Sequence, residues 1–504
     1  MLRPAALLLR SMIFVHRWMG VVLAIVFAFW FVSGIVMMYW SFPEVSAADR
    51  LAHSPVLNPA QIKLTAVEAY AKLEVGGPPD QVHLNTMFGR PVYRFRKGRS
   101  DTPVFADNGE QQPEVTHALS DQTASSWTGI PVSLASVEEN TEEDQWTVPQ
   151  SYRQHRPMLK YSYPDGQQVY VSGSTGEVVQ YTTTASRFWA WTGAIPHWLY
   201  FTQLRKNGPA WTQTVIWSSG IGTVASLIGM LIALWLYSPS RKYRYAGQPA
   251  RVPYSGQKRW HTIFGLLFGL TCTTWAFSGM MSMDPFPIRS GGAIGSEGRG
   301  KGRTTPRIPA ALAGGRLNLA DFSARSPQDA LRLVAGQIPV KELQLVRFAG
   351  DPVYLAVDEQ QRSRIIPVTG APLVQFDTDR IKEIVRQAAG NGGLAELSVA
   401  NEYDLYYLDR TGHKPLPVVV AQLNDANRTR YYIDPKAGRI VGTYGAQGWV
   451  NRWLYHGLHS LDFPWLYKYR PLWDVVVLSL MSGGVAICVT SLILSWRVLK
   501  RKLT

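Results

Sequence analysis

Four long apolar runs constrain the fold of this chain more than any other feature. They cover residues 12–40, 211–237, 263–283 and 472–496 of a 504-residue sequence. A helix needs about 20 residues to cross the ~30 Å hydrocarbon core of a bilayer, and each run reaches that length. The sequence therefore predicts an α-helical membrane protein with four transmembrane helices.

The positions of the positive charges predict how the chain is oriented in the membrane. The formal net charge is +15, and most of it comes from cations beside the apolar runs. Lys and Arg collect at the cytoplasmic ends of membrane helices, whereas nucleic-acid binders gather them on a folded surface. We therefore expect a lipid bilayer and no nucleic acid as partner, with both chain termini in the cytoplasm. The flanking cations are Arg3, Arg10, Arg17, Arg241, Lys242, Arg244, Arg251, Lys258, Arg259, Arg497, Lys500, Arg501 and Lys502.

This topology in a bacterial inner membrane predicts two large periplasmic domains. The segment 45–48 resembles a signal-peptide cleavage site, but the apolar run before it exceeds the usual ~7–15 residues, so we expect the first helix to be retained. The expected segments are a cytoplasmic N-terminus with the first helix (1–43), a first periplasmic domain (44–208), the second helix (209–238), a cytoplasmic basic loop (239–259), the third helix (260–284), a second periplasmic domain (285–468), the fourth helix (469–497) and a cytoplasmic tail (498–504).

The two halves of the sequence match each other as a tandem repeat. The first and third helices align at an offset of 245 positions, as in His16 and His261. The later parts align at an offset of 261 to 262, as in Tyr170 and Tyr432. A Gly/Arg-rich stretch around 290–307 accounts for most of the difference and is expected to be a flexible linker. Parallel repeats of this kind are related by a pseudo-two-fold axis along the membrane normal.

The periplasmic domains are expected to have an α+β fold. Residues 65–74 and 327–335 have the apolar spacing of helices. Alternating apolar and polar stretches follow, and they end in glycine-containing turns at 173–176 and 434–438. This order predicts a helix followed by short hairpins.

Two histidines occupy matching places in the first and third helices. In each helix a glycine follows at i+4 and a tryptophan continues the same face. A haem with two axial imidazoles needs a wider gap than the ~8–10 Å of ordinary helix packing, and glycine supplies that space. Alternatively, each histidine could bond at headgroup level and each glycine could serve helix packing. We favour a shared ligand for the matched set His16, Gly20, Trp30 and His261, Gly265, Trp275.

A second histidine pair lies shortly before the second and fourth helices. His197 and His459 occur in aromatic segments of the kind found at membrane interfaces, so an aromatic belt with incidental histidines is the alternative. His456 could replace His459 as the ligand. Zinc is a weaker alternative, because cysteines and clustered carboxylates are missing from these segments. We expect two bis-histidine haems, of the non-covalent b type because no Cys-x-x-Cys-His motif occurs, with His16, His261, His197 and His459 as axial iron ligands.

A third matched pair, His155 and His413, lies in the periplasmic domains. An acidic-aromatic stretch that includes Asp404 and Tyr406 precedes the second of these histidines. We favour a solvated loop here and keep a substrate-binding surface as the alternative. The sequence has no Walker loop, dinucleotide fingerprint, nucleophile elbow or zinc-protease motif, and we assign no catalytic residue. Electrons would come from an unidentified cytoplasmic or quinol donor.

The whole pattern resembles the PepSY-associated transmembrane family. The resemblance extends over nearly the whole chain and implies that the periplasmic domains are PepSY-like. Some family members are inner-membrane haem proteins that reduce ferric siderophores in the periplasm. One departure is Pro196-His197-Trp198, where the second half has two histidines. The motifs that carry the resemblance are His16-Arg17-Trp18, the Ser-Gly pairs at 33–34 and 278–279, Thr175-Gly176-Glu177-Val178, Ala437-Gly438-Arg439-Ile440 and His456-x-x-His459-x-x-Asp462-Phe463.

The resulting hypothesis is transmembrane electron transfer by a haem-dependent oxidoreductase of iron uptake. Reduction to Fe(II) would weaken the binding of iron by the hard oxygen donors of a siderophore and release it. A negative-inside potential favours outward electron movement by ~2.3 kcal/mol per charge per 100 mV. The first alternative is a non-catalytic, membrane-anchored PepSY module that inhibits proteases or acts as a chaperone. The second is a transporter, against which the sequence shows few helix breaks.

Overall fold

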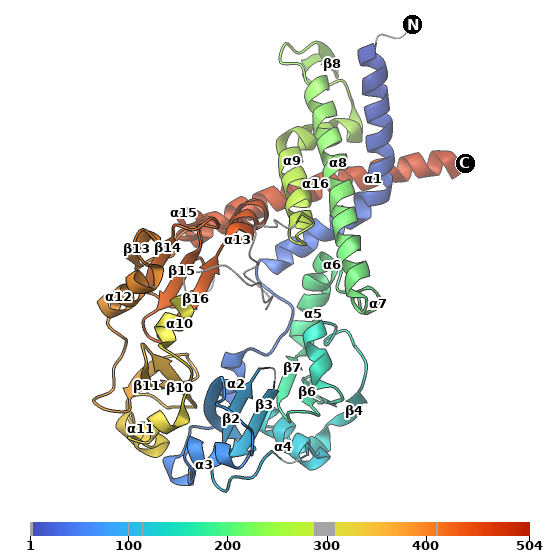
Figure 1. Ribbon diagram of the computed structural model, residues 1–504. Helices are drawn as coiled ribbons and strands as arrows, with labels where there is room; N and C mark the ends of the chain where they lie inside the picture. Colours follow the sequence, from blue (N-terminus) through green and yellow to red (C-terminus); the bar gives the residue numbers. More distant parts are fainter. Residues whose placement is uncertain (1–3, 99, 113, 287–307, 410–411, 504) are drawn as a thin grey trace.

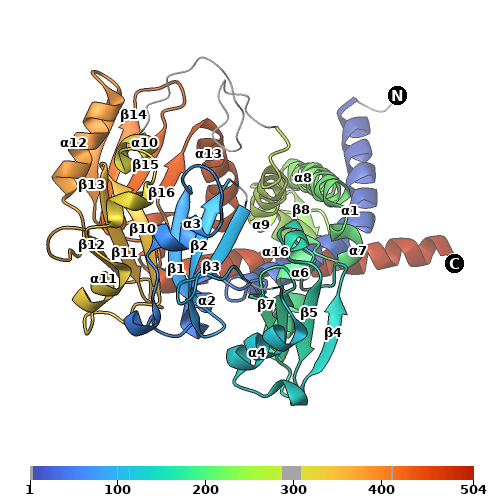
Figure 2. The same ribbon diagram turned by 60° about the horizontal axis from the view of Figure 1, so that its bottom comes forward.

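The computed structural model describes residues 4–503, except residues 99, 113, 287–307 and 410–411. The linker expected around 290–307 lies outside the described residues. A helical part and a sheet-containing part lie next to each other (Figure 1), and both ends of the chain are on the helical part, away from the sheets. Figure 2 shows the same separation from a second direction.

Four helices in the described residues are long and apolar enough to cross a membrane, which confirms that prediction. They are α1 (Pro4–Met37), α8 (Gly208–Leu236), α9 (Gly256–Met281) and α16 (Arg470–Leu503). Helices α8 and α9 pack side by side, and α16 crosses them (Figure 1) while contacting α1 and α9. A two-stranded hairpin, β8 (Tyr243–Tyr245) and β9 (Gln248–Ala250), joins α8 to α9 at the end far from the sheets.

Within the described residues, the sheet-containing part has one antiparallel sheet of six strands and two of four. The six-stranded sheet has the order β12-β11-β10-β1-β2-β3. Its strands are β1 (Gln81–Met87), β2 (Arg90–Lys97), β3 (Ser100–Phe105), β10 (Glu342–Phe348), β11 (Asp351–Val357) and β12 (Ser363–Pro367). The four-stranded sheets comprise β4 (Ser136–Asn140), β5 (Met158–Ser162), β6 (Gln168–Ser172) and β7 (Val178–Thr182), and β13 (Leu394–Ala400), β14 (Val418–Leu423), β15 (Arg430–Asp434) and β16 (Arg439–Tyr444).

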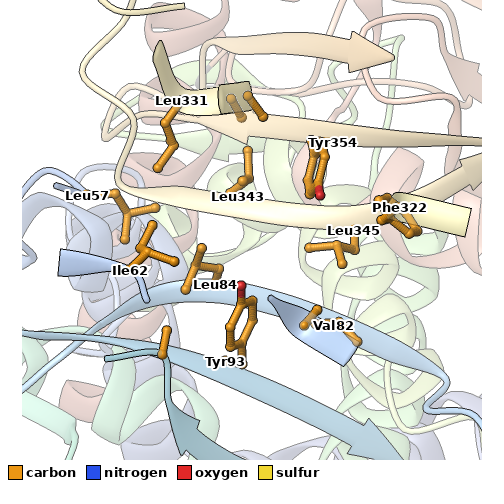
Figure 3. Close-up of a cluster of buried hydrophobic side chains, with 14 of the residues drawn as sticks. Leu57, Ile62, Val82, Leu84, Tyr93, Phe322, Leu331, Leu343, Leu345 and Tyr354 are labelled. Atoms are coloured by element: carbon orange, nitrogen blue, oxygen red, sulfur yellow. The ribbon is translucent and has the colours of Figure 1, made fainter. Parts of the chain in front are cut away.

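The six-stranded sheet joins the two regions that the sequence treats as separate domains. Strands β1 and β10 pair over three residue pairs, from Val82 with Leu345 to Leu84 with Leu343. Alternate residues of both strands point to one face, where they form a continuous apolar core with helix residues from both regions (Figure 3). The two regions therefore share one apolar core.

Two-residue turns set the register of the central hairpins. The turn between β1 and β2 has Phe88 and Gly89 at positive φ, and the turn between β10 and β11 has Ala349 and Gly350 at positive φ. Positive φ at both turn residues is the type I′ geometry, whose twist matches that of the flanking strands. The two hairpins therefore have the same local geometry.

Short helical segments connect the four-stranded sheets to the long helices. After β7, α5 (Thr184–Thr192) and α6 (Ala194–Trp198) lead to α8. After β16, α13 (Ala446–Asn451), a π-helical segment (η5, Arg452–Gly457) and α14 (Leu458–Ser460) lead to α16. The remaining helices are α2 (Ala47–His53), α3 (Ala66–Ala71), α4 (His117–Thr128), α7 (Thr202–Arg205), α10 (Ile308–Ala313), α11 (Pro327–Leu333), α12 (Thr378–Ala389) and α15 (Pro464–Tyr467).

Candidate functional site

The first histidine pair lies in the half of the helical part nearer the β8–β9 hairpin. We call His16 of α1 and His261 of α9 the hairpin-side pair; their ring centres are 6.1 Å apart and their planes are inclined by 36°. The Nδ1–H of His16 donates to the carbonyl of Ala225 on α8 at 2.9 Å. Nδ1 of His261 lies 3.0 Å from Oγ1 of Thr490 on α16. All four long helices thus contribute to this pair.

Glycines shape the space around the hairpin-side pair. A Cβ atom on Gly229 would lie 2.4 Å from Cε1 of His16, so the ring packs directly on the α8 backbone. By contrast, a Cβ on Gly265 would meet no atom within 4 Å, and one on Gly20 would meet only Oγ of Ser491, at 3.8 Å. The glycines one turn after each histidine therefore leave open space beside the rings.

The second pair connects the short segments after the sheets to the long helices. We call His197 of α6 and His459 of α14 the sheet-side pair; their ring centres are 6.0 Å apart, with planes at 68°. Nδ1 of His197 lies 3.1 Å from Oγ of Ser33 on α1, and Nδ1 of His459 lies 3.0 Å from Oγ of Ser278 on α9. The two rings are held in the same way by matching helix positions.

A cavity of ≈ 100 Å³, partly open to the surroundings, adjoins the sheet-side pair. Both histidines, Trp30 and Trp275 are among its lining residues. Nε1 of Trp30 is buried without a hydrogen-bond partner in the described part of the chain. A bound group or an ordered water usually supplies the acceptor for such a buried donor.

The structure distinguishes His459 from His456. The side chain of His456 is 50% exposed, and its Nδ1 lies 3.6 Å from the Asp462 carboxylate, whereas His459 faces His197. Desolvation lowers the pKa of His197 to about 4, although its hydrogen bond to the Trp30 carbonyl opposes this. The ring is therefore neutral at physiological pH, which is the form that binds a metal.

The third pair and its neighbours are placed differently. His155 is half-buried beside Ser172, whereas His413 is exposed. Asp404 accepts hydrogen bonds from the Tyr432 hydroxyl and from the backbone of Tyr406, so this carboxylate holds its own loop to β15. The Tyr406 ring packs 4.1 Å from the Trp449 ring. These interactions give Asp404 a role within the fold.

Sequence reasoning missed the groups that hold the imidazoles. Ser33 and Ser278 were visible as repeated Ser-Gly pairs, but their contact with His197 and His459 depends on how the short segments fold back. Thr490 and Gly229 contact the hairpin-side pair without any matched counterpart in the other half. No group of three or more His, Cys, Asp and Glu that could hold a metal ion occurs among the described residues.

No curated protein matches the chain. A family model described as the PepSY-associated TM region matches residues 13–339. That range includes His16, His197 and His261, together with Ser33 and Ser278, and it ends before the β10–β11 hairpin. Because the match covers more than half of the 504 residues, the resemblance seen in the sequence is confirmed, and the chain belongs to the PepSY-associated transmembrane family.

Proposed function

We propose that this protein transfers electrons across the inner membrane through two b-type haems, each bound by one histidine pair. The observation that carries this proposal is the spacing of the rings, 6.1 Å and 6.0 Å between centres. Two metal–imidazole bonds of about 2 Å, with about 1.1 Å from each nitrogen to its ring centre, put the ring centres about 6 Å apart. In each pair, both imidazoles would therefore be spaced to hold one iron.

The nitrogen that faces the iron follows from the hydrogen bonds. The Nδ1 atoms of His16 and His197 lie against the carbonyls of Ala225 and Trp30, and a carbonyl only accepts, so these Nδ1 atoms carry hydrogen. Nε2 then carries the lone pair that binds a metal. Hydrogen bonding at the other ring nitrogen is also the usual way in which proteins orient a histidine ligand.

The surroundings fit a flat, largely apolar group. Near the hairpin-side pair, Gly265 leaves open space, and the sheet-side pair has its cavity and the unpartnered Nε1 of Trp30. A bis-histidine haem supplies a one-electron Fe(III)/Fe(II) couple. The protein's part is to hold each imidazole, to exclude water and to fix the distance between the two sites.

That distance supports one site in each leaflet. Seventeen positions separate His16 from Ser33 on α1, and seventeen separate His261 from Ser278 on α9. At ~1.5 Å per residue this corresponds to about 25 Å of helix. The buried rings of Phe31 and Trp275 lie 5.8 Å apart, and Phe27 lies 6.4 Å from Phe31. These aromatic side chains occupy the helix segments between the two pairs.

Charge and aromatic residues support a periplasmic location for the sheets. The cations of the β8–β9 connection and of both termini favour a cytoplasmic location for that end. At the other end, large aromatic side chains are exposed in the segments near the sheets, as expected at the outer interface. They include Phe188, Trp191, Phe201, Trp453, Trp465 and Tyr469.

Equivalent interactions in the two halves support a tandem pseudo-two-fold repeat. The Tyr93 hydroxyl donates to the Leu64 carbonyl, and the Tyr354 hydroxyl donates to the Arg325 carbonyl at the same offset. The histidine–serine contacts repeat as well. Two PepSY-like periplasmic regions joined through β1 and β10 fit this symmetry.

The substrate proposal rests on family resemblance. We infer that ferric siderophores or other ferric chelates are reduced at the periplasmic face and that Fe(II) is released there. Electrons would come from a cytoplasmic or quinol donor. The sheet-side pair and its partly open cavity offer the place nearest the sheets from which an electron could leave.

The decisive test is a haem count on the purified protein and its histidine variants. Pyridine haemochrome and reduced-minus-oxidised spectra should give two b-type haems per chain. His16→Ala or His261→Ala should remove one haem, and His197→Ala or His459→Ala the other, whereas His456→Ala serves as a matched control that keeps both. A wild-type protein without a Soret band would reject the proposal.

Substrate reduction needs a separate test. Proteoliposomes in which the sheet-containing part faces outward would be loaded with a reductant, and ferric hydroxamate and ferric catecholate chelates added outside. An Fe(II)-specific indicator dye should report reduction of at least one chelate in the wild type and none in His459→Ala. Equal rates in the two proteins would leave electron transfer to these chelates without support.

A further inference from the structure

Each sheet-side histidine docks on a Ser-Gly pair of a long helix. The serine oxygen lies within hydrogen-bond distance of Nδ1, and the following glycine lies beneath the ring. A Cβ on Gly34 would be 3.4 Å from Cε1 of His197, and one on Gly279 would be 3.8 Å from Cε1 of His459. The pair thus combines a polar contact for the ring nitrogen with a flat surface for the ring edge.

The serine hydroxyls can only accept hydrogen bonds from these rings. Oγ of Ser33 donates its single hydrogen to the Trp30 carbonyl at 3.2 Å, and Oγ of Ser278 donates to the Trp275 carbonyl at 3.1 Å. A hydroxyl has one hydrogen and two lone pairs, so towards the imidazole it accepts. This arrangement selects the Nδ1–H tautomer for both His197 and His459.

The serines are fully enclosed. Ser33 is 1% exposed and Ser278 is 0% exposed. Water therefore cannot easily replace the hydroxyl if it is removed, and the Nδ1–H of His459 would lose a bond in a low-dielectric setting. His197 would lose one of two acceptors, because its Nδ1–H also lies 3.1 Å from the Trp30 carbonyl. His16 of the hairpin-side pair uses a backbone carbonyl that no substitution removes.

We propose that Ser33 and Ser278 are positioning residues that accept a hydrogen bond from Nδ1–H of His197 and His459 and thereby set the reduction potential at the sheet-side pair. This inference rests on the proposed haem function. An acceptor on Nδ1–H raises electron density at Nε2, strengthens its bond to iron and favours Fe(III) over Fe(II). Removal of both hydroxyls should therefore raise the potential of one haem and weaken its binding.

The test is a redox titration of the full-length protein carrying Ser33→Ala and Ser278→Ala together. We expect one of the two reduction waves to move to higher potential, and haem affinity at that site to fall about 10- to 100-fold. The wave of the hairpin-side haem should stay unchanged in the same sample. The double variant Ser33→Thr/Ser278→Thr keeps both acceptors and should restore the wild-type potential.

A control separates this effect from the loss of a serine hydroxyl elsewhere on a long helix. Ser479 of α16 is exposed and donates to the carbonyl of Val475, its own helix, at 2.6 Å. Ser479→Ala should leave both waves in place. If both reduction waves stay unchanged in the Ser33→Ala/Ser278→Ala protein, or if both move equally, the inference is overturned. The proposed function still stands in that case, provided that two haems are bound. A wild-type protein without haem would instead remove the proposed function itself.

Discussion

The hairpin-side and sheet-side histidine pairs have the same ring spacing but reach it by different means. His16 and His261 both belong to long helices, and the partners of their Nδ1 atoms lie on the other two long helices. His197 and His459 belong to short segments that follow the sheets, and only their serine partners lie on long helices. The first pair is built by helix packing alone, whereas the second also needs the sheets.

Because of this difference, the two pairs should be sensitive to different kinds of substitution. The hairpin-side pair is close-packed, with His16 against the backbone at Gly229, so small changes in volume there should displace the ligand. The sheet-side pair adjoins a cavity, so it should tolerate added volume but respond to loosening of the segments that carry its histidines. Each kind of dependence can be tested at one pair while the other serves as the internal control.

The largest expected effect comes from Gly229→Ala. The new Cβ would lie 2.4 Å from Cε1 of His16, so the ring must move, and the haem count should fall from two to one per chain. Helix propensity is not the cause, because Ala favours helices more than Gly by about 1 kcal/mol. Gly279→Ala is the control: its Cβ would be 3.8 Å from Cε1 of His459, which is ordinary contact. Equal haem contents in the two variants would contradict the close packing inferred at His16.

A smaller effect is expected from Arg452→Ala. Arg452 is 3% exposed and donates to the carbonyls of Leu405 and Asp462, which tie η5 to two loops. Loss of these charged hydrogen bonds should cost about 1.5–3 kcal/mol and loosen the segment that carries His459. Haem titration should show weaker binding at one site and unchanged binding at the other.

The matched control for this change is Arg470→Ala, which removes an exposed arginine that pairs with Asp474 at the start of α16. That variant should bind both haems as the wild type does. If Arg452→Ala also weakens haem binding at the hairpin-side pair, then both pairs depend on the same part of the fold.

The smallest expected effect is on the rate of electron transfer between the two proposed haem sites. Phe31 is 5% exposed and lies between Phe27 and Trp275, so Phe31→Leu should widen the gap between aromatic rings. The rate of electron tunnelling falls exponentially with distance, so electron transfer across the membrane should slow several-fold. The measurement is the reduction of ferricyanide trapped inside proteoliposomes by dithionite added outside, with potassium and valinomycin to balance charge. Both haem spectra should remain. Phe29→Leu alters an exposed position of the same helix and should leave the rate unchanged.

The sequence predicted the long helices well because their signal is local. Twenty consecutive apolar residues identify a span without any knowledge of neighbours, and the four expected runs correspond to α1, α8, α9 and α16. The proximity of His16 and His261 was also accessible, because the two residues occupy matching positions in the two halves of the sequence. Both features follow from sequence spacing alone.

Other features depend on contacts that no local pattern encodes. The serine contacts of His197 and His459 arise because short segments after the sheets fold back onto α1 and α9. The sequence left His456 and His459 as alternatives, since three positions apart on a helix they share a face, and only tertiary packing turns one of them towards His197. The pairing of β1 with β10 joins residues more than 250 positions apart, beyond the reach of periodicity.

That β1–β10 junction has a consequence for expression of partial chains. A protein ending after the second long helix would keep β1, β2 and β3, but the edge of β1 that pairs with β10 would have no neighbouring strand. Exposed strand edges pair readily with another chain. Because the β1–β10 pairing is antiparallel, two such truncated molecules could join β1 to β1 about a two-fold axis, forming an isologous dimer in place of the single polypeptide.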